Sequence, residues 1–150
     1  MIACKGFPGK GEGLKGKKSV YRFDLRKREL VTKPALVIDP SVFEERKSGK
    51  DATKKLREFF DPGATGDFHP SAIAWNEHRR AWFVLAAKGQ KLIVLSKGGK
   101  LLAVKKLNHK LFRQPEGLAF DAVGNMYIAN EGAGDKATLL RFDYHDSTSK

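Results

Sequence analysis

Two glutamates occupy positions from which their carboxylates could do chemistry together. Glu116 begins one predicted strand, and Glu131 follows the end of the next. Consecutive strands of an antiparallel meander bring such positions to one end of the sheet. Carboxylate oxygens suit a hard cation such as Ca²⁺, and they also serve as general acids or bases. The structural alternative is that Glu116 accepts hydrogen bonds from backbone N–H groups of its own or a neighbouring sheet.

Three further polar residues complete the candidate ligand-binding set, namely His69, Ser71 and Asn130. Ser71 has the place in an earlier segment that Glu116 has later, and Asn130 directly precedes Glu131. His69 could line the same site or be a satisfied structural histidine. The chain has neither the paired-histidine metal motif nor the Gly-x-Ser-x-Gly elbow, so no catalytic residue is assigned. The single Cys4 excludes an internal disulfide and a Cys-rich zinc site.

These residues belong to a repeat. Residues 69–75 read His-Pro-Ser-Ala-Ile-Ala-Trp, and residues 114–120 read Gln-Pro-Glu-Gly-Leu-Ala-Phe, 45 positions later. Residues 81–85 correspond to 125–129, and residues 20–24 correspond to 139–143. Short apolar strands alternate with turn residues in each copy, which is typical of an antiparallel meander.

A four-stranded unit that recurs every 40 to 50 residues predicts an all-β chain of β-propeller blades, because one such sheet must stack on neighbours to bury both faces. We expect blade pieces at about 1–40, 67–108 and 113–145, in one partial domain spanning 1–150. A propeller closes with about four to eight blades. We therefore expect an incomplete ring, either part of a longer propeller or a half-ring that a second copy completes.

One segment departs from this pattern. Between 41 and 62, apolar residues punctuate a charged stretch, and Leu56, Phe59 and Phe60 share one helical face. Asp61, Pro62 and Gly63 favour a turn after it, because proline cannot continue a helix. The sequence therefore predicts one short helical insertion between the first two blades.

The net charge of +12 favours anionic partners, whether nucleic acid, acidic lipid or polyanionic wall material. The basic residues are scattered rather than gathered on one helix, which argues against a nucleic-acid reader. The longest apolar run, residues 81–87, is much shorter than the roughly 20 residues of a spanning helix. The first residues show no signal-peptide pattern.

The motifs resemble the SdiA-regulated family of bacterial β-propellers. The resemblance lies in residues 68–74, 99–102, 112–120 and 124–132, with residues 3–6 and 20–25 fitting a preceding blade. It implies a six-bladed, NHL-like propeller in the bacterial cell envelope, in the periplasm or associated with the membrane. The family domain is longer, so a site that spans the whole ring is not expected to be complete here.

We therefore expect a non-catalytic propeller segment that binds a small molecule or an envelope protein at the channel mouth or blade loops. Peripheral membrane association and self-association of half-rings are further expected interactions. The alternative is a hydrolase acting on phosphoesters or lactones through a channel-bound cation, with Ca²⁺ as the candidate cofactor and Glu116 or Glu131 as its ligand.

Overall fold

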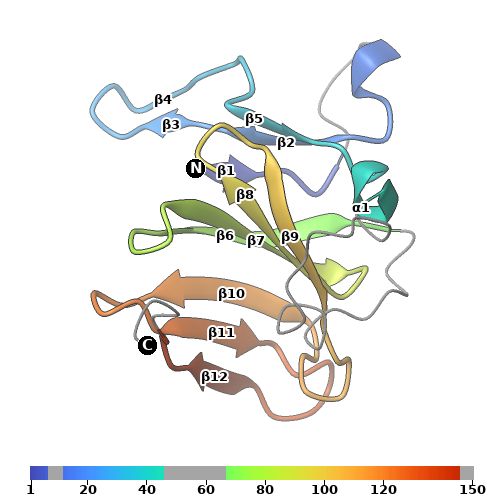
Figure 1. The fold of residues 1–150 in the computed structure, drawn as a ribbon, viewed down its shortest axis with the longest axis vertical. Coiled ribbons are helices and arrows are strands. Elements are labelled where there is room, and N and C mark those ends of the chain that lie inside the picture. The colour runs from blue at the N-terminus through green and yellow to red at the C-terminus, as the bar shows by residue number, and fades with distance from the viewer. Residues whose placement is uncertain (7–11, 46–66, 146–150) are drawn as a thin grey trace.

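The computed structural model describes residues 1–6, 12–45 and 67–145. Apart from a 3-10 helix at Glu12–Leu14 and the short helix α1 (Val42–Glu45), their regular secondary structure is β (Figure 1). The all-β prediction is therefore confirmed. The helical insertion predicted at 41–62 begins as α1, and residues 46–62 lie outside the described residues.

The middle blade is a four-stranded antiparallel meander, as its alternating strands and turns predicted. Its strands follow the order β6-β7-β8-β9. They are β6 (His69–Asn76), β7 (Ala81–Lys88), β8 (Lys91–Ser96) and β9 (Leu101–Lys106). Gly89 and Gln90 join β7 to β8, and both have positive φ, which suits a tight two-residue hairpin.

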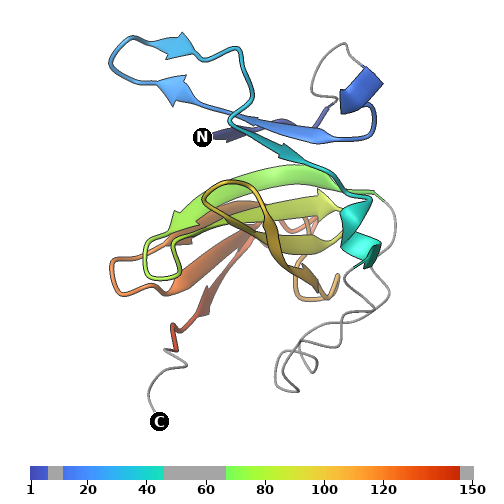
Figure 2. The same ribbon diagram turned by 45° about the horizontal axis from the view of Figure 1, so that its top comes forward.

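Two flanking blades contribute three paired strands each within the described residues. The first blade is β1 (Ile2–Ala3), β2 (Lys18–Tyr21) and β5 (Leu36–Ile38), and the hairpin of β3 (Phe23–Asp24) and β4 (Glu29–Leu30) projects from it (Figure 2). The third blade is β10 (Pro115–Phe120), β11 (Met126–Asn130) and β12 (Thr138–Phe142).

Strand register shows how the three blades correspond. Ala129 pairs with Leu139 in the third blade, and Ala3 pairs with Val20 in the first. Leu85 pairs with Leu92 at the same place in the middle blade. The described strands of the first blade therefore match the second to fourth strands of the middle blade.

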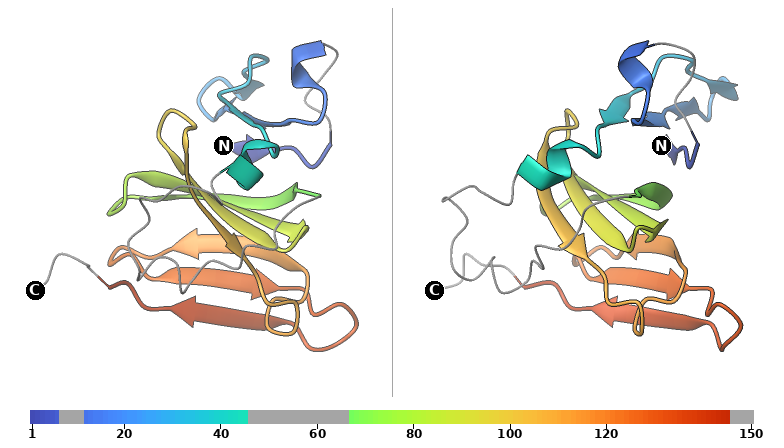
Figure 3. Two further views of the ribbon diagram at one scale, coloured as in Figure 1. Left: turned by 45° about the vertical axis from the view of Figure 1, so that its right-hand side comes forward. Right: turned by 90° about the vertical axis from the view of Figure 1, so that its right-hand side faces the viewer.

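The three blades stack face to face, with the middle blade between the other two (Figure 3). Strand β10 lies beside β6 and β7, and β1 lies beside β6. Alternate residues of β7 enter different cores: Val84 and Ala86 pack toward the first blade, while Phe83 and Leu85 pack toward the third. This arrangement is that of successive propeller blades, and the described residues form no closed ring.

Both inner strands carry a β-bulge at the same place. The register shifts between Pro70 and Ala72 in β6 and between Pro115 and Gly117 in β10. A bulge inserts one extra residue and re-aims its side chain. The extra residues are Ser71 and Glu116, two of the residues that the sequence singled out.

Candidate functional site

The five predicted site residues lie at one end of the middle and third blades. His69 begins β6, Ser71 and Glu116 are the bulge residues, and Asn130 ends β11 next to Glu131. Because β10 and β11 are antiparallel, the start of one lies beside the end of the other, where Pro115 pairs with Asn130. In a propeller this end of the inner strands forms a mouth of the central channel, and we call it the channel mouth.

The Ser71 hydroxyl is occupied by the fold. Its Oγ donates to the Pro115 carbonyl of the third blade at 2.6 Å and accepts the Ala87 N–H at 3.2 Å. The Leu85 carbonyl lies within 3.4 Å as a second, weaker acceptor. A hydroxyl has one proton to donate. Ser71 therefore links the two inner strands rather than presenting a hydroxyl to a ligand.

Asn130 is also held inside the third blade, with only 3% of its surface exposed. Its Nδ2 donates to Thr138 Oγ1 at 2.9 Å and to the Leu111 carbonyl at 3.4 Å. Within the described residues its Oδ1 has no hydrogen-bond partner. The side chain thus ties β11 to β12 and to the loop that precedes β10.

The structure gives the two glutamates different partners. Glu116 Oε1 lies 3.5 Å from Lys5 Nζ, an ion pair that reaches from the first blade to the third. Both side chains are exposed, so this pair is worth at most about 1 kcal/mol. Glu131 is exposed, and its backbone N–H donates to the Gln114 carbonyl at 3.0 Å. Among residues 1–6, 12–45 and 67–145, no three His, Cys, Asp or Glu side chains gather to hold a metal ion.

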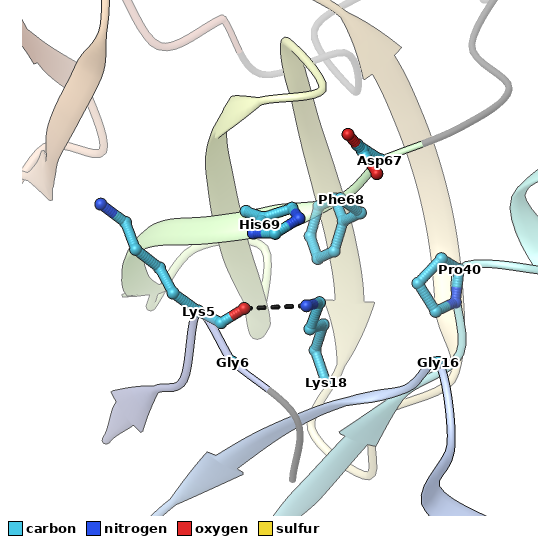
Figure 4. A pocket seen from close by; sticks show the side chains of 8 residues that line it. All are labelled: Lys5, Gly6, Gly16, Lys18, Pro40, Asp67, Phe68 and His69. Carbon is cyan, nitrogen blue, oxygen red and sulfur yellow. Dashed lines mark hydrogen bonds between the residues drawn. The ribbon is translucent and has the colours of Figure 1, made fainter.

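A pocket of about 470 Å³ opens between the first and middle blades at the channel mouth (Figure 4). The first blade supplies Lys5 and Lys18, and Pro40 comes from the segment after β5. The middle blade supplies Phe68 and His69. Of the predicted site residues, His69 is the one that lines this pocket.

Lys18 reaches the pocket because it shares a face of β2 with Val20. Val20 is fully buried in the core between the first and middle blades, and side chains two residues apart in a strand point the same way. Lys18 is only 6% exposed, and its Nζ donates to the Lys5 carbonyl at 2.8 Å. Figure 4 shows its ammonium directed toward Phe68 and His69.

The surroundings of His69 are electropositive. Burial lowers its pKa first, and the charges of Lys18 and Lys88 lower it further, while Asp67 opposes them more weakly. Asp67 is itself paired with Lys88 at 3.0 Å, a hydrogen bond that lowers the pKa of this carboxyl. These effects favour the neutral form of the His69 imidazole, which lies beside lysines of two blades.

The sequence did not indicate the role of Lys5 and Lys18. Basic residues scattered along a chain are usually solvated. The available signal was the alternation in β2, which places Lys18 on the buried side with Val20. Recognising it required knowing which face of the first blade meets the next one.

At the opposite end, the middle and third blades pack against each other. His78 Nε2 lies 2.9 Å from the Ala122 carbonyl, and its ring packs on Tyr144 with centroids 5.0 Å apart. The Arg79 guanidinium also lies over the Tyr144 ring at 5.5 Å. These contacts join the middle blade to the third.

No family model, curated protein or solved structure that was compared with this chain matches it. Membership of the SdiA-regulated family therefore stays a prediction from the motifs. None of the helices in the described part of the chain has the length and hydrophobicity needed to span a bilayer.

Proposed function

We propose that this chain is a non-catalytic, ligand-binding segment of an envelope β-propeller of the SdiA-regulated kind. The ligand is a small molecule that enters the pocket between the first and middle blades at the channel mouth. The observation that carries this proposal is the pocket itself, which two blades build together around Lys18 and His69. Its volume of about 470 Å³ falls within the range of small-molecule sites, about 300–1,000 Å³.

Binding fits the geometry better than catalysis. The Ser71 hydroxyl already donates its proton to the Pro115 carbonyl. Glu116 forms an ion pair with Lys5, and this lysine competes with any cation for the carboxylate. The hydrolase alternative requires Ca²⁺ to bind at Glu116 or Glu131. Calorimetry with Ca²⁺ on the chain and on Glu116→Gln tests it, and we expect no heat that depends on Glu116.

The binding function itself is tested by screening the ¹⁵N-labelled chain against a library of small neutral, cationic and anionic compounds. We expect at least one compound to shift the amide signals of Lys5, Lys18 and His69 while leaving His78 and Ala122 at the opposite end unchanged. Shifts confined to the opposite end, or no shift with any compound, would contradict the proposal.

A further inference from the structure

We propose that the hairpin of β3 and β4 docks on the surface of a membrane that contains anionic lipid. Its basic residues contact the lipid headgroups, and Leu25 at its tip enters the boundary with the acyl chains. This interaction goes beyond the proposed function, because it uses a different surface. Lys18 at the start of β2 lines the pocket, whereas the hairpin follows Tyr21 at the other end of that strand.

The hairpin carries apolar side chains on its surface. Phe23 pairs with Leu30 across the two strands, so their side chains lie on one face. Phe23 is 38% exposed, Leu30 is 49% exposed, and Leu25 in the turn between the strands is 83% exposed. Among the described residues, Leu25 is the most exposed large hydrophobic side chain. Burying such a side chain releases free energy, so the tip suits a partner with an apolar interior.

The same turn is basic. Arg26, Lys27 and Arg28 follow Leu25, and all three are exposed. The Asp24 carboxylate holds the turn in place, because its Oδ1 accepts the backbone N–H groups of Arg26 at 3.0 Å and Lys27 at 3.1 Å. Residues 22–30 include four basic and two acidic residues. The tip therefore presents an exposed leucine among basic side chains.

A neighbouring turn adds two lysines. Lys97 and Lys100 lie in the connection between β8 and β9, and both are exposed. A Cβ added to Gly99 in this connection would lie 3.2 Å from the Leu36 side chain, so the connection adjoins β5 of the first blade. In Figure 1 the connection and the hairpin both lie toward the left of the view. The basic surface therefore extends beyond the hairpin.

The shape of the hairpin favours a membrane over a small molecule or a protein. Small-molecule sites are concave, whereas the hairpin projects from its blade (Figure 2). A standard protein interface covers about 800 Å² on each partner, far more than three apolar side chains supply. A lipid surface accepts a small projecting apolar group and surrounds it with anionic headgroups.

The side-chain chemistry favours a membrane over a nucleic acid. A nucleic acid would attract the basic residues, but its bases bind by stacking on aromatic rings. Leu25 and Leu30 are aliphatic, and Phe23 is the one aromatic residue of the hairpin. A bilayer instead takes up aliphatic and aromatic side chains alike, and its headgroups attract the adjacent arginines and lysine.

The test is cosedimentation of the full chain with lipid vesicles. One set contains phosphatidylcholine mixed with phosphatidylglycerol, and the other contains phosphatidylcholine alone. We expect the chain to bind the anionic vesicles at low salt and to bind the neutral vesicles much more weakly. Added salt should weaken binding, because it screens the attraction between exposed charges.

Leu25→Ser tests the apolar contact. It should weaken binding to the anionic vesicles at least about tenfold, which corresponds to about 1.4 kcal/mol, because the leucine side chain is no longer buried in lipid. Leu139→Ser is the matched control. It removes a leucine that is 68% exposed on the third blade, and it should leave binding unchanged.

A double variant tests the charges. Arg26→Gln combined with Lys27→Gln should weaken binding about thirtyfold, or about 2 kcal/mol, at about 1 kcal/mol for each basic residue near an anionic surface. Lys110→Gln combined with Lys136→Gln removes the same charge from exposed residues in loops at the channel mouth. This control should keep nearly all of the binding.

Each contrary outcome has a distinct meaning. Absence of binding to anionic vesicles at low salt would overturn the proposal. So would equal losses in the two double variants, because general charge would then explain the binding. Full binding by Leu25→Ser would overturn the insertion of the tip.

Other occupants of the tip are also detected. A dimer that Leu25→Ser dissociates in sedimentation would show that a second copy covers the tip, and would overturn the proposal. Tighter binding to duplex DNA than to vesicles, weakened by the hairpin double variant, would also overturn it. None of these variants alters a residue that lines the pocket. The proposed ligand-binding function is therefore tested separately by the compound library.

Discussion

The middle and third blades share one strand pattern but differ in what covers them. Val20, Leu92 and Leu139 occupy corresponding places in the first, middle and third blades, on the face toward the next blade. Their exposed fractions are 0%, 6% and 68%. The first two are covered by a following blade, and the third faces open space in the described structure. Burial in this architecture therefore comes from the neighbouring blade as much as from the pattern within one blade.

The bulge residues show the same difference. Ser71 in the middle blade donates to Pro115 of the third blade. Glu116 has the corresponding place in the third blade, and its partner is Lys5 on the first blade. Where a next inner strand is present, the bulge residue links to it. Where the described residues provide none, the same position is an exposed acid.

The largest expected effect comes from comparing Gly89 with Gly134. They lie in the connections between the second and third strands of the middle and third blades. A Cβ added at Gly89 of the middle blade would overlap the Asp67 carbonyl oxygen, and the φ of Gly89 is +97°. Gly134, in the corresponding connection of the third blade, has a φ of +94° and no atom within 4 Å of an added Cβ. We expect Gly89→Ala to cost about 4 kcal/mol or more. Gly134→Ala should cost only about 1–2 kcal/mol from the left-handed backbone. Urea unfolding measures both, and equal costs would mean that Asp67 does not cross over Gly89.

The next prediction concerns the covered and open leucines. Leu92→Ala should destabilise the chain by about 2–5 kcal/mol, because it leaves a cavity in the core between the middle and third blades. Leu139→Ala should cost less than about 0.5 kcal/mol, as surface substitutions usually do. The free energy of unfolding from urea titration decides between them. A large cost at Leu139 would show that a further blade or a second copy covers this face, and sedimentation would identify a second copy.

A smaller difference is expected at the bulges. Ser71→Ala leaves the Ala87 N–H and the Pro115 carbonyl without their hydroxyl partner and should cost about 1–3 kcal/mol. Glu116→Ala removes an exposed ion pair and should cost at most about 1 kcal/mol. Thermal unfolding of the two variants measures both costs. A greater loss of stability in Glu116→Ala than in Ser71→Ala would contradict this prediction.

The smallest expected effect is a change in stability at low pH. Asn76 of the middle blade and Asp121 of the third blade lie in corresponding turns, where each side-chain oxygen accepts a hydrogen bond from a backbone N–H group. Of the two, only Asp121 can titrate. Burial disfavours its charged form, but hydrogen bonds from Asn125, Tyr127 and Val123 outweigh that and lower its pKa. A lowered folded-state pKa contributes stability above the unfolded value, about 3.9, and this stability is lost as pH falls through the folded pKa.

Asp121→Asn should therefore differ most from the parent chain at pH 7, and the difference should shrink toward pH 3. Urea midpoints at the two pH values measure it. A difference that stays the same at both values would show that the charge of Asp121 does not stabilise the turn.

The meanders could be predicted from the alternation of short strands with turns. The location of the site residues at one end of the blades could also be predicted, because it follows from the 45-residue repeat. The roles of Ser71, which links two blades, and of Lys18, which lines the pocket, could not be predicted. A bulge leaves no clear mark in the sequence, so the link from Ser71 to the next blade is visible only in the register. Gly117 follows the bulge residue Glu116 in β10. The structure places it against the Ala129 side chain, 2.9 Å from an added Cβ.

Native-state hydrogen exchange of β7 against β11 tests most directly whether the blades shield one another. Both are second strands with a paired strand on each side. Within residues 1–6, 12–45 and 67–145, β7 has a blade on each face and β11 has a blade on one face. We predict that the slowest amides of β7 exchange only through global unfolding, while those of β11 exchange through a partial opening of lower free energy. Equal opening free energies in the two strands would contradict the account.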